Sequence, residues 1–395
     1  MKSLTARPFF ITTLGAILLG CAGLPPQVVS TLPVVGAGFE TTCVTGGENR
    51  LNCFGSSVGD GTSGVHTSPA APALGKVKAF ALSAFLPFGC AILGDPSTGK
   101  AGPVWCWTGS GIPTHVQGLS DAIAISVGGP GACAVVAADL SVRCWSLSNP
   151  FGTPDYVSAF FPQTPSMVRG LQTGIVQVSV GQHFACAVRS VDSQVYCWGR
   201  NDAGQLGRGT VGAATDPELD ASVPVTNLSA KQVAAGTTHA CAIASDNTIK
   251  CWGESSSGQL GNGTNASMYV PTPQLAAGIN NAINVAASAA FTCATLSDLT
   301  ARCWGQNLPT VPTAGTLGVG LLISAAGPGT IEFKKPGAVS MPLPVKGLTG
   351  AIFISTGATH ACASGLGVFI HCWGSNTFGQ LGDGTTDNSL EPVTP

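Results

Sequence analysis

Cysteine is the residue type whose spacing in this 395-residue chain points most directly to chemistry. Fourteen of the fifteen cysteines fall into pairs, which are Cys43 with Cys53, Cys90 with Cys106, Cys133 with Cys144, Cys186 with Cys197, Cys241 with Cys251, Cys293 with Cys303, and Cys362 with Cys372. Partners about ten positions apart fit two antiparallel strands joined by a short turn, with opposing Cβ atoms at about the separation a disulfide needs. We predict disulfides and no metal site, because zinc sites use much closer cysteines. The pair of Cys90 and Cys106 needs a longer loop, and whether it is bridged stays open.

The remaining cysteine, Cys21, ends a segment typical of protein export. Two basic residues precede the apolar run Phe9–Leu19, which is shorter than the roughly 20 residues of a membrane span. The motif Leu18-Leu19-Gly20-Cys21 resembles the lipobox of bacterial lipoproteins, in which the cysteine is lipidated and becomes the mature N-terminus. This resemblance implies lipidation at Cys21, and Ala22 after it implies the outer membrane or cell surface. A plain secretory signal that contains a cysteine is the alternative.

Composition indicates how the rest of the chain is organised. An exported protein meets an oxidising environment, which agrees with paired cysteines. Charged residues make up only 9% of the chain, glycine is frequent at 53, and the net charge of −2 provides no basic stripe, so we expect no nucleic-acid partner. We predict a signal peptide at 1–20, a tether at 21–35 and one domain at 36–395, attached to the membrane only through the lipid.

Internal repeats follow the cysteine pairs. The segments Cys197–Thr210, Cys251–Thr264 and Cys372–Thr385 each run from Cys-Trp-Gly to a Gly-Gln-Leu-Gly loop, and degenerate copies follow the other pairs. Apolar residues alternate upstream of each pair, which is typical of strands. Each repeat offers about four strands in roughly 50 residues, the size of a propeller blade. The chain is therefore predicted to be all-β.

These motifs resemble those of the regulator of chromosome condensation repeat family, whose signature is a Gly-x-x-His-x-Cys/Ala strand followed by Trp-Gly-x-Asn-x-x-Gly-Gln-Leu-Gly-x-Gly. The resemblance implies a seven-bladed β-propeller of four-stranded antiparallel blades, a count that agrees with the seven cysteine pairs. We expect the chain termini to close the ring. The tail Leu390–Pro395 repeats a Pro-Val segment found before other repeats, and we predict that it adds a strand to the blade that begins near Val34.

Other residues that could do chemistry have simpler interpretations. His239 and His360 occupy a column that holds phenylalanine in other repeats, which indicates a packing position. The Gly-x-Ser-x-Gly match at Gly55–Gly59 lies in a glycine loop and lacks the strand-to-helix turn of a hydrolase nucleophile. No paired carboxylates or nucleophile and base sets emerge. We therefore predict no catalytic residue, metal or cofactor.

Two departures from the repeat are the predicted binding loops. The first, Ser146–Pro165, carries aromatic anchors at Phe151, Tyr156, Phe160 and Phe161, which either recognise a partner or cover a blade edge. The second, Gly320–Met341, lies where the family's eukaryotic exchange factor carries a wedge that acts on a GTPase. Its candidate residues are Leu321, Leu322, Ile323, Phe333, Lys334 and Lys335.

We interpret the chain as an exported, lipid-anchored, monomeric propeller that binds an unknown protein or glycan of the cell envelope through its rim loops. Secreted members of the resembling family include protein inhibitors of β-lactamases, which work by binding alone. One alternative is a carbohydrate-binding or carbohydrate-active protein with a site at the central mouth of the ring. Another is a purely structural surface protein.

Overall fold

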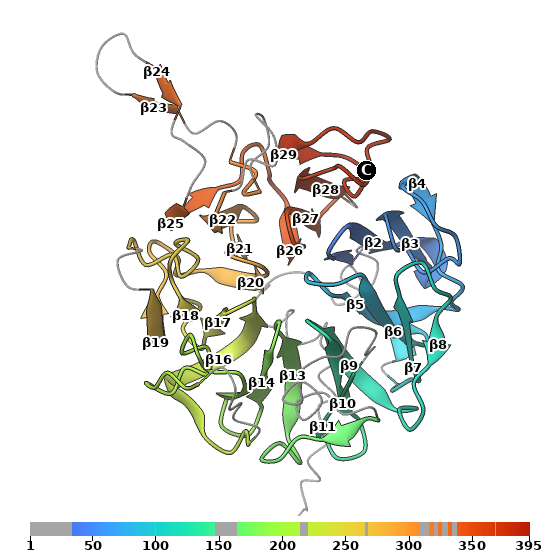
Figure 1. Cartoon of the computed structure of the whole chain (residues 1–395), viewed down its shortest axis with the longest axis horizontal. Helices are drawn as coiled ribbons and strands as arrows, with labels where there is room; N and C mark the ends of the chain where they lie inside the picture. Colours follow the sequence, from blue (N-terminus) through green and yellow to red (C-terminus); the bar gives the residue numbers. More distant parts are fainter. Residues whose placement is uncertain are drawn as a thin grey trace, which may run out of the picture.

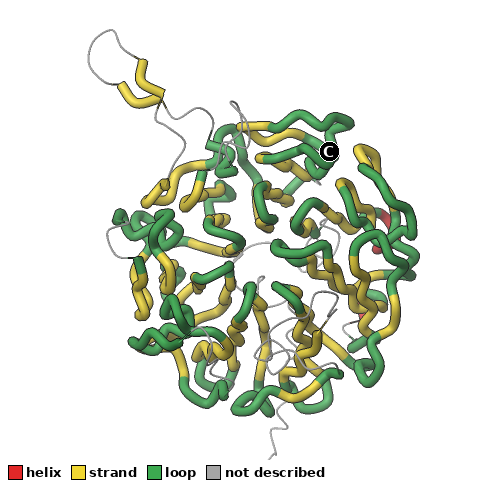
Figure 2. The backbone as a smooth tube through the Cα atoms, in the orientation of Figure 1, coloured by secondary structure: helices red, strands yellow, loops and turns green. Residues whose placement is uncertain are grey.

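The computed structural model describes residues 34–98, 100–146, 164–213, 220–264, 268–307, 316–319, 323–325, 331–333, 338–367 and 369–395. Strands dominate these residues, and the helical turns are the short 3₁₀ segments η1 (Gly47–Asn49) and η2 (Pro96–Thr98). Figure 2 shows the strands arranged around a central axis. In this described part of the chain, no helix has the length and apolar character needed to cross a bilayer.

The strands form seven antiparallel blades in chain order, as Figure 1 shows. Blades one to three are β1 (Val35–Ala37), β2 (Thr41–Thr45), β3 (Leu51–Gly55) and β4 (His66–Ala70); β5 (Val77–Leu82), β6 (Phe88–Leu93), β7 (Val104–Thr108) and β8 (Thr114–His115); and β9 (Ala122–Val127), β10 (Gly131–Val136), β11 (Val142–Ser146) and β12 (Ser166–Met167). Blades four and five are β13 (Ile175–Val180), β14 (Phe184–Arg189), β15 (Gln194–Gly199) and β16 (Pro224–Ala235), followed by β17 (His239–Ala244), β18 (Ile249–Glu254) and β19 (Tyr269–Leu275). Blades six and seven are β20 (Ala282–Ala287), β21 (Phe291–Leu296), β22 (Ala301–Gln306) and β25 (Ala338–Pro344), then β26 (Ala351–Thr356), β27 (His360–Gly365), β28 (Phe369–Gly374) and β29 (Ser389–Val393).

One long strand, β16, serves two blades. Its first half pairs with β15, where Tyr196 lies opposite Pro224, and its second half pairs with β17, where Ala235 lies opposite Ala240. The fourth and fifth blades are therefore hydrogen-bonded into one seven-stranded sheet. With the five four-stranded sheets of the described chain, this sheet makes the seven blades that the repeats predict.

The second strand of each blade is buried on both faces. Every residue of β10, β17, β21 and β27 is buried, although successive side chains of a strand point to opposite faces. This pattern arises because a blade is covered on both sides by its neighbours. Alanine, cysteine and valine suit these positions, since neighbouring sheets must pack closely.

The cysteine pairs lie directly opposite each other on the second and third strands of every blade. The register partners are Cys43 and Cys53, Cys90 and Cys106, Cys133 and Cys144, Cys186 and Cys197, Cys241 and Cys251, Cys293 and Cys303, and Cys362 and Cys372. Their Cα atoms are 4.0–4.1 Å apart and their sulfur atoms lie at bonding distance. The structure therefore supports all seven pairs as disulfides, that of Cys90 and Cys106 included. Each disulfide lies within one blade.

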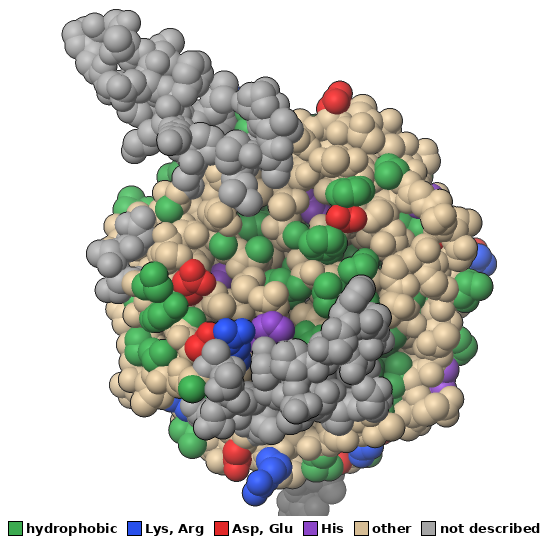
Figure 3. All heavy atoms as spheres, viewed as in Figure 1, with side chains coloured by type: hydrophobic (Ala, Val, Ile, Leu, Met, Phe, Trp, Pro, Cys, Tyr) green, Lys and Arg blue, Asp and Glu red, His purple; other side chains and the backbone are tan. Residues whose placement is uncertain are grey.

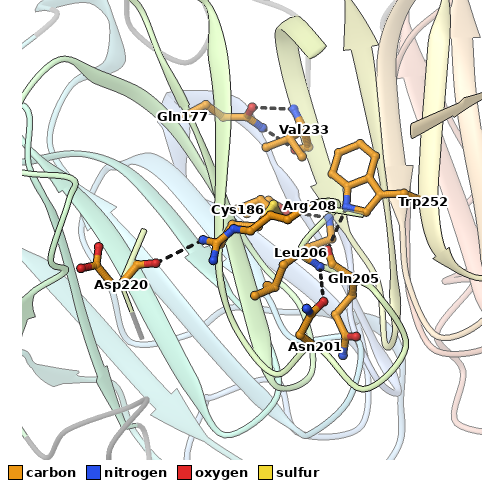
Figure 4. Close-up of a disulfide and its surroundings, with 12 residues drawn as sticks. Gln177, Cys186, Asn201, Gln205, Leu206, Arg208, Asp220, Val233 and Trp252 are labelled. Carbon is orange, nitrogen blue, oxygen red and sulfur yellow. Dashed lines mark hydrogen bonds between the residues drawn. A yellow bond between two sulfur atoms is a disulfide. The ribbon is translucent and has the colours of Figure 1, made fainter. Parts of the chain in front are cut away.

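The Gly-Gln-Leu-Gly loop packs against the tryptophan of the next blade (Figure 4). Leu206 is buried beneath Trp252, whose Nε1 donates a hydrogen bond of 2.8 Å to the carbonyl of Gln205. Asn201 holds the turn, because its Oδ1 accepts from the Leu206 N–H at 3.1 Å. A Cβ on Gly207, where φ is +70°, would lie only 2.8 Å from the indole nitrogen. The motif is therefore a device for joining neighbouring blades.

The ring closes where its first and last blades meet, but without the predicted exchange of a terminal strand. The tail strand β29 pairs with β28 in the last blade, with Val393 opposite Cys372, and adds no strand to the first blade. The Pro-Val segments at Pro224 and Pro392 each pair with the third strand of their own blade, as Tyr196 with Pro224 and Cys372 with Val393 show. Contact between blades one and seven closes the ring instead, where the N–H of Ala37 donates to Ser355 Oγ at 2.9 Å.

Candidate functional site

The two predicted binding loops leave the ring from the same face. The first follows Ser146 at the end of β11, and the second follows the end of β22. Both are the third strands of their blades, and third strands run in the same direction because every blade repeats the same antiparallel order. We call the face where the third strands end the loop face. It is the surface to which both irregular segments are attached.

Most of the predicted loop residues lie outside the described residues. These are Phe151, Tyr156, Phe160, Phe161, Leu321, Leu322, Lys334 and Lys335, and Cys21 lies outside them as well. Ile323 and Phe333 are register partners in a separate two-stranded sheet of β23 (Ile323–Ala325) and β24 (Ile331–Phe333). Figure 1 draws this small sheet outside the ring, beside the blade of β22 and β25.

The charged side chains that follow β15 and end β18 on the loop face have partners within the protein. Arg200 and Asp202, which follow β15, form an ion pair at 2.5 Å. The pKa of nearby His183 is lowered, first by burial and then by the positive charge of Arg200. Glu254 at the end of β18 accepts a hydrogen bond from the Thr238 hydroxyl. Figure 3 shows few charged side chains among uncharged ones around the centre of one face of the ring.

The central channel is lined by the first strands of the blades, and its side chains are used to join neighbours. Gln177 donates from Nε2 to the Val233 carbonyl and accepts from the Val233 N–H at Oε1, both at 2.8 Å, as Figure 4 shows. Ser179 Oγ accepts from the Ala235 N–H at 3.0 Å. The channel holds a cavity of about 220 Å³ whose described lining has no carboxyl, amino or imidazole group. The described lining therefore contains no side chain that could act as the acid or base of a carbohydrate-active site.

The histidines assigned to a packing position are buried between blades. His239 and His360 are both fully buried, and each contacts a threonine of the following blade through Nε2. Burial lowers the pKa of both to about 3, so both are neutral at physiological pH. Within the described residues, no group of histidine, cysteine and carboxylate side chains has the arrangement of a metal site.

One site escaped the sequence analysis. A cavity of about 480 Å³ lies at the rim between blades two and three, and Trp107, Ile112 and Trp145 are among its lining residues. The signal for it is a missing motif, because Cys106-Trp107 is not followed by a Gly-Gln-Leu-Gly loop. A comparison of the repeats column by column could have found it.

The geometry defines a propeller whose blades are joined by loops of one recurring kind and stapled by disulfides, and comparison with known proteins agrees. Residues 192–243, 249–295 and 369–394 match the regulator of chromosome condensation (RCC1) repeat, and residues 175–205 and 230–259 match a second model of that repeat. The chain therefore contains repeats of the RCC1 family, which lie at residues 175–295 and 369–394.

Individual relatives agree on the repeat and differ in their overall size. The chain is 28% identical to the ultraviolet-B receptor UVR8 of Arabidopsis thaliana over 222 residues, which are 55% of this chain and 45% of UVR8. It is 26% identical to the human E3 ubiquitin-protein ligase HERC2 over 275 residues, which are 58% of this chain and 6% of HERC2. The chain thus spans less than half the length of these curated relatives.

Solved structures share the fold at low sequence identity. Yeast RCC1 (Prp20), in a crystal structure with Kap60 bound, superposes with a TM-score of 0.69 at 18% identity and covers 100% of this chain and 89% of its own. Human WBSCR16 superposes with a TM-score of 0.62 at 17% identity, covering 84% and 85%. These similarities establish the propeller fold alone.

Proposed function

We propose that this protein is an exported, lipid-anchored scaffold that binds another protein of the cell envelope through the loop face. The observation that carries the proposal is the common origin of both irregular segments, which follow the third strands β11 and β22 on one face of the ring. A rigid ring with long loops on one side is a common design for recognition, because the scaffold limits the entropy lost on binding.

The disulfides and the N-terminal sequence support the proposed compartment. Seven disulfides are stable where the environment is oxidising, which supports a location outside the cytoplasm. We assign residues 1–20 to the signal peptide, Cys21 to the lipid, residues 21–35 to a tether and residues 36–395 to the propeller. Fractionation tests the anchor: the Cys21→Ser protein should move from the membrane to the soluble fraction.

Protein binding is favoured over catalysis as the role of the propeller. Yeast RCC1 (Prp20), which shares the fold, was crystallised with Kap60 bound. The described lining of the cavity in the central channel of this chain lacks ionisable groups. HERC2 is a ligase by name, but the matched segment covers only 6% of it. Binding alone is therefore the function we assign to this domain.

The test is partner capture from the parent organism's envelope with matched deletions on the loop face. The baits are the Cys21→Ser chain and two variants that lack residues 147–163 or 321–337. The control bait lacks residues 214–219, another connection after a third strand, which contains no aromatic or lysine residue. We expect the control to recover a specific protein that at least one loop deletion loses. Identical recovery by all correctly folded baits would refute binding through these loops.

A further inference from the structure

The loop that joins neighbouring blades follows a rule in five of the seven interfaces. A branched apolar side chain from one blade's loop is fully buried against the aromatic residue that follows the second cysteine of the next blade. The pairs are Val58 with Trp107, Leu206 with Trp252, Leu260 with Trp304, Leu317 with Trp373 and Leu381 with Phe54. The site beneath each aromatic ring is therefore built to hold a turn that carries a leucine or valine.

Between blades two and three this side chain is missing. β7 ends at Thr108 and β8 begins at Thr114, so only residues 109–113 connect them. In blade four, by contrast, residues 200–223 separate β15 from β16. The apolar cluster that contains Trp145 includes no residue from the 109–113 connection. Trp145 thus keeps the place of Trp252 in the repeat, but the 109–113 connection contributes no apolar side chain to the cluster around it.

The space left by the missing loop is the cavity of about 480 Å³ at this rim. Its walls correspond to those around the Leu206 loop: Cys106 and Trp107 belong to the blade that would supply the loop, and Trp145 with Pro165 to the next. In blade five, Pro271 lies against the loop of blade four, since its carbonyl accepts from the Gly209 N–H at 2.8 Å, and Pro273 two residues later is the register equivalent of Pro165. The cavity therefore retains the shape of a loop site.

An unpaired polar atom points to a ligand in the same place. Trp145 is only 3% exposed, and its Nε1 has no hydrogen-bond partner. At Trp252 and Trp304 this atom donates to a loop carbonyl, at 2.8 and 2.9 Å. A buried N–H without an acceptor is unfavourable, so an occupant that supplies a carbonyl would gain from it. Trp373 Nε1 is also unpaired, but there Leu317 already fills the site.

We infer that this cavity binds a glycine-flanked turn of a partner protein, with a leucine-like side chain under Trp145 and a backbone carbonyl that accepts from Trp145 Nε1. His115 is the one ionisable side chain in the described lining, which carries no carboxylate, lysine or arginine, and this favours a largely neutral turn over a strongly charged ligand. The volume lies in the range of sites that bind small ligands. The Gly-Gln-Leu-Gly turns in the described part of a second copy are not available for this contact, because Leu206, Leu260 and Leu381 are buried in their own interfaces.

This inference rests on the proposed function, since it gives the chemistry of one contact with a protein partner. The probe is a cyclic peptide that copies residues 201–209, which contain the Gly-Gln-Leu-Gly sequence. The readout is the indole N–H resonance of Trp145 in ¹H–¹⁵N spectra of the full mature chain, assigned with Trp145→Phe. We expect this resonance to shift with saturation below about 1 mM. A peptide with the Leu206→Ser change should bind at least about 10-fold more weakly.

Two variants separate this site from non-specific binding. Thr114→Trp fills the mouth of the cavity and should abolish the shift, whereas Val191→Trp adds the same ring at a position that is 85% exposed on blade four and should not. No shift of Trp145, or an equal shift in Thr114→Trp, would overturn the inference. If Thr114→Trp still captures the envelope partner of the wild type, the proposed function stands and this assignment fails.

Discussion

Nε2 of His360 in the last blade lies 2.8 Å from Oγ1 of Thr42 in the first, and this buried hydrogen bond spans the point where the ring closes. The same pair joins blades five and six, where His239 Nε2 lies 2.9 Å from Thr292 Oγ1. Where the column holds phenylalanine, the next blade supplies alanine. Those pairs are Phe88 with Ala132, Phe184 with Ala240 and Phe291 with Ala361. Five of the seven interfaces thus use one of two solutions, one polar and one apolar.

The two solutions predict a compensating pair of substitutions at the closure. His360→Phe alone leaves the buried Thr42 hydroxyl without its partner, and Thr42→Ala alone leaves the imidazole without its partner. We expect each to lower the free energy of unfolding by about 1–3 kcal/mol. The double variant should lie within about 1 kcal/mol of the wild type at pH 7, because it recreates the Phe–Ala pair. Urea unfolding of the wild type, the two single variants and the double variant gives the double-mutant cycle. If the losses of the two single variants simply add in the double variant, the Phe–Ala pair cannot replace the His–Thr pair.

Stability should fall in mild acid because of the same histidines. Burial lowers the pKa of His239 and His360 to about 3, whereas an unfolded histidine titrates near 6.5. Protons therefore bind the unfolded chain preferentially between these values, and the loss begins as the pH drops below about 6.5. At pH 5 each histidine should cost about 2 kcal/mol.

The control for this pH dependence keeps the rest of the molecule unchanged. A chain with His239→Phe and Thr292→Ala should lose about half of the part of the fall in unfolding free energy between pH 7 and pH 5 that comes from His239 and His360. His115→Gln, at a partly exposed position, should leave the fall as in the wild type. Equal pH dependence in all three proteins would show that the buried imidazoles are not the cause.

Glycine is required in the joining loop for two separate reasons. At Gly207, alanine would meet both an unfavourable φ of +70° and the Trp252 indole, whereas at Gly278 φ is +69° and the space is open. We expect Gly278→Ala to cost about 1 kcal/mol from the backbone alone. Gly207→Ala should cost about 2–4 kcal/mol. Thermal unfolding compares the two, and similar losses would show that the contact with Trp252 is unimportant.

The disulfides can be counted by mass. Without reductant the mature protein should resist alkylation at fourteen cysteines, and after reduction all of them should react. Replacing both Cys43 and Cys53 with alanine should lower the unfolding free energy by about 2–3 kcal/mol, the entropy of a loop closed over a separation of 10 residues. Cys21→Ser is the matched control and should leave the melting temperature unchanged. Fewer than six protected pairs would contradict the assignment.

Local patterns in the sequence carry most of the fold. Cys133 and Cys144, or Cys293 and Cys303, are predicted partners because a hairpin places them opposite each other, and similar spacings recur around the ring. The role of the tail could not be obtained this way, because a Pro-Val segment lies between two blades and β16 pairs with both. Whether such a strand pairs with the preceding or the following blade depends on hydrogen bonds to residues distant in sequence, and not on the composition of the strand.

The candidate sites were harder to predict than the blades. The histidine column indicated packing, but the partner Thr292 follows His239 by one full repeat and is visible only when columns of adjacent repeats are compared. Trp145 was missed for a different reason. Its cavity arises because residues 109–113 are too few to form a covering loop, and sequence motifs report residues that are present rather than those that are missing.

The seven sulfur bridges of the described chain each hold one hairpin, and none connects one sector of the ring to the next. Disulfide formation therefore stabilises each blade without linking neighbouring blades covalently. After a single proteolytic cut between two blades, only packing and hydrogen bonds would hold the ring closed at that point. Under mechanical tension the ring would open at the cut, while each disulfide-bonded hairpin would keep its shape.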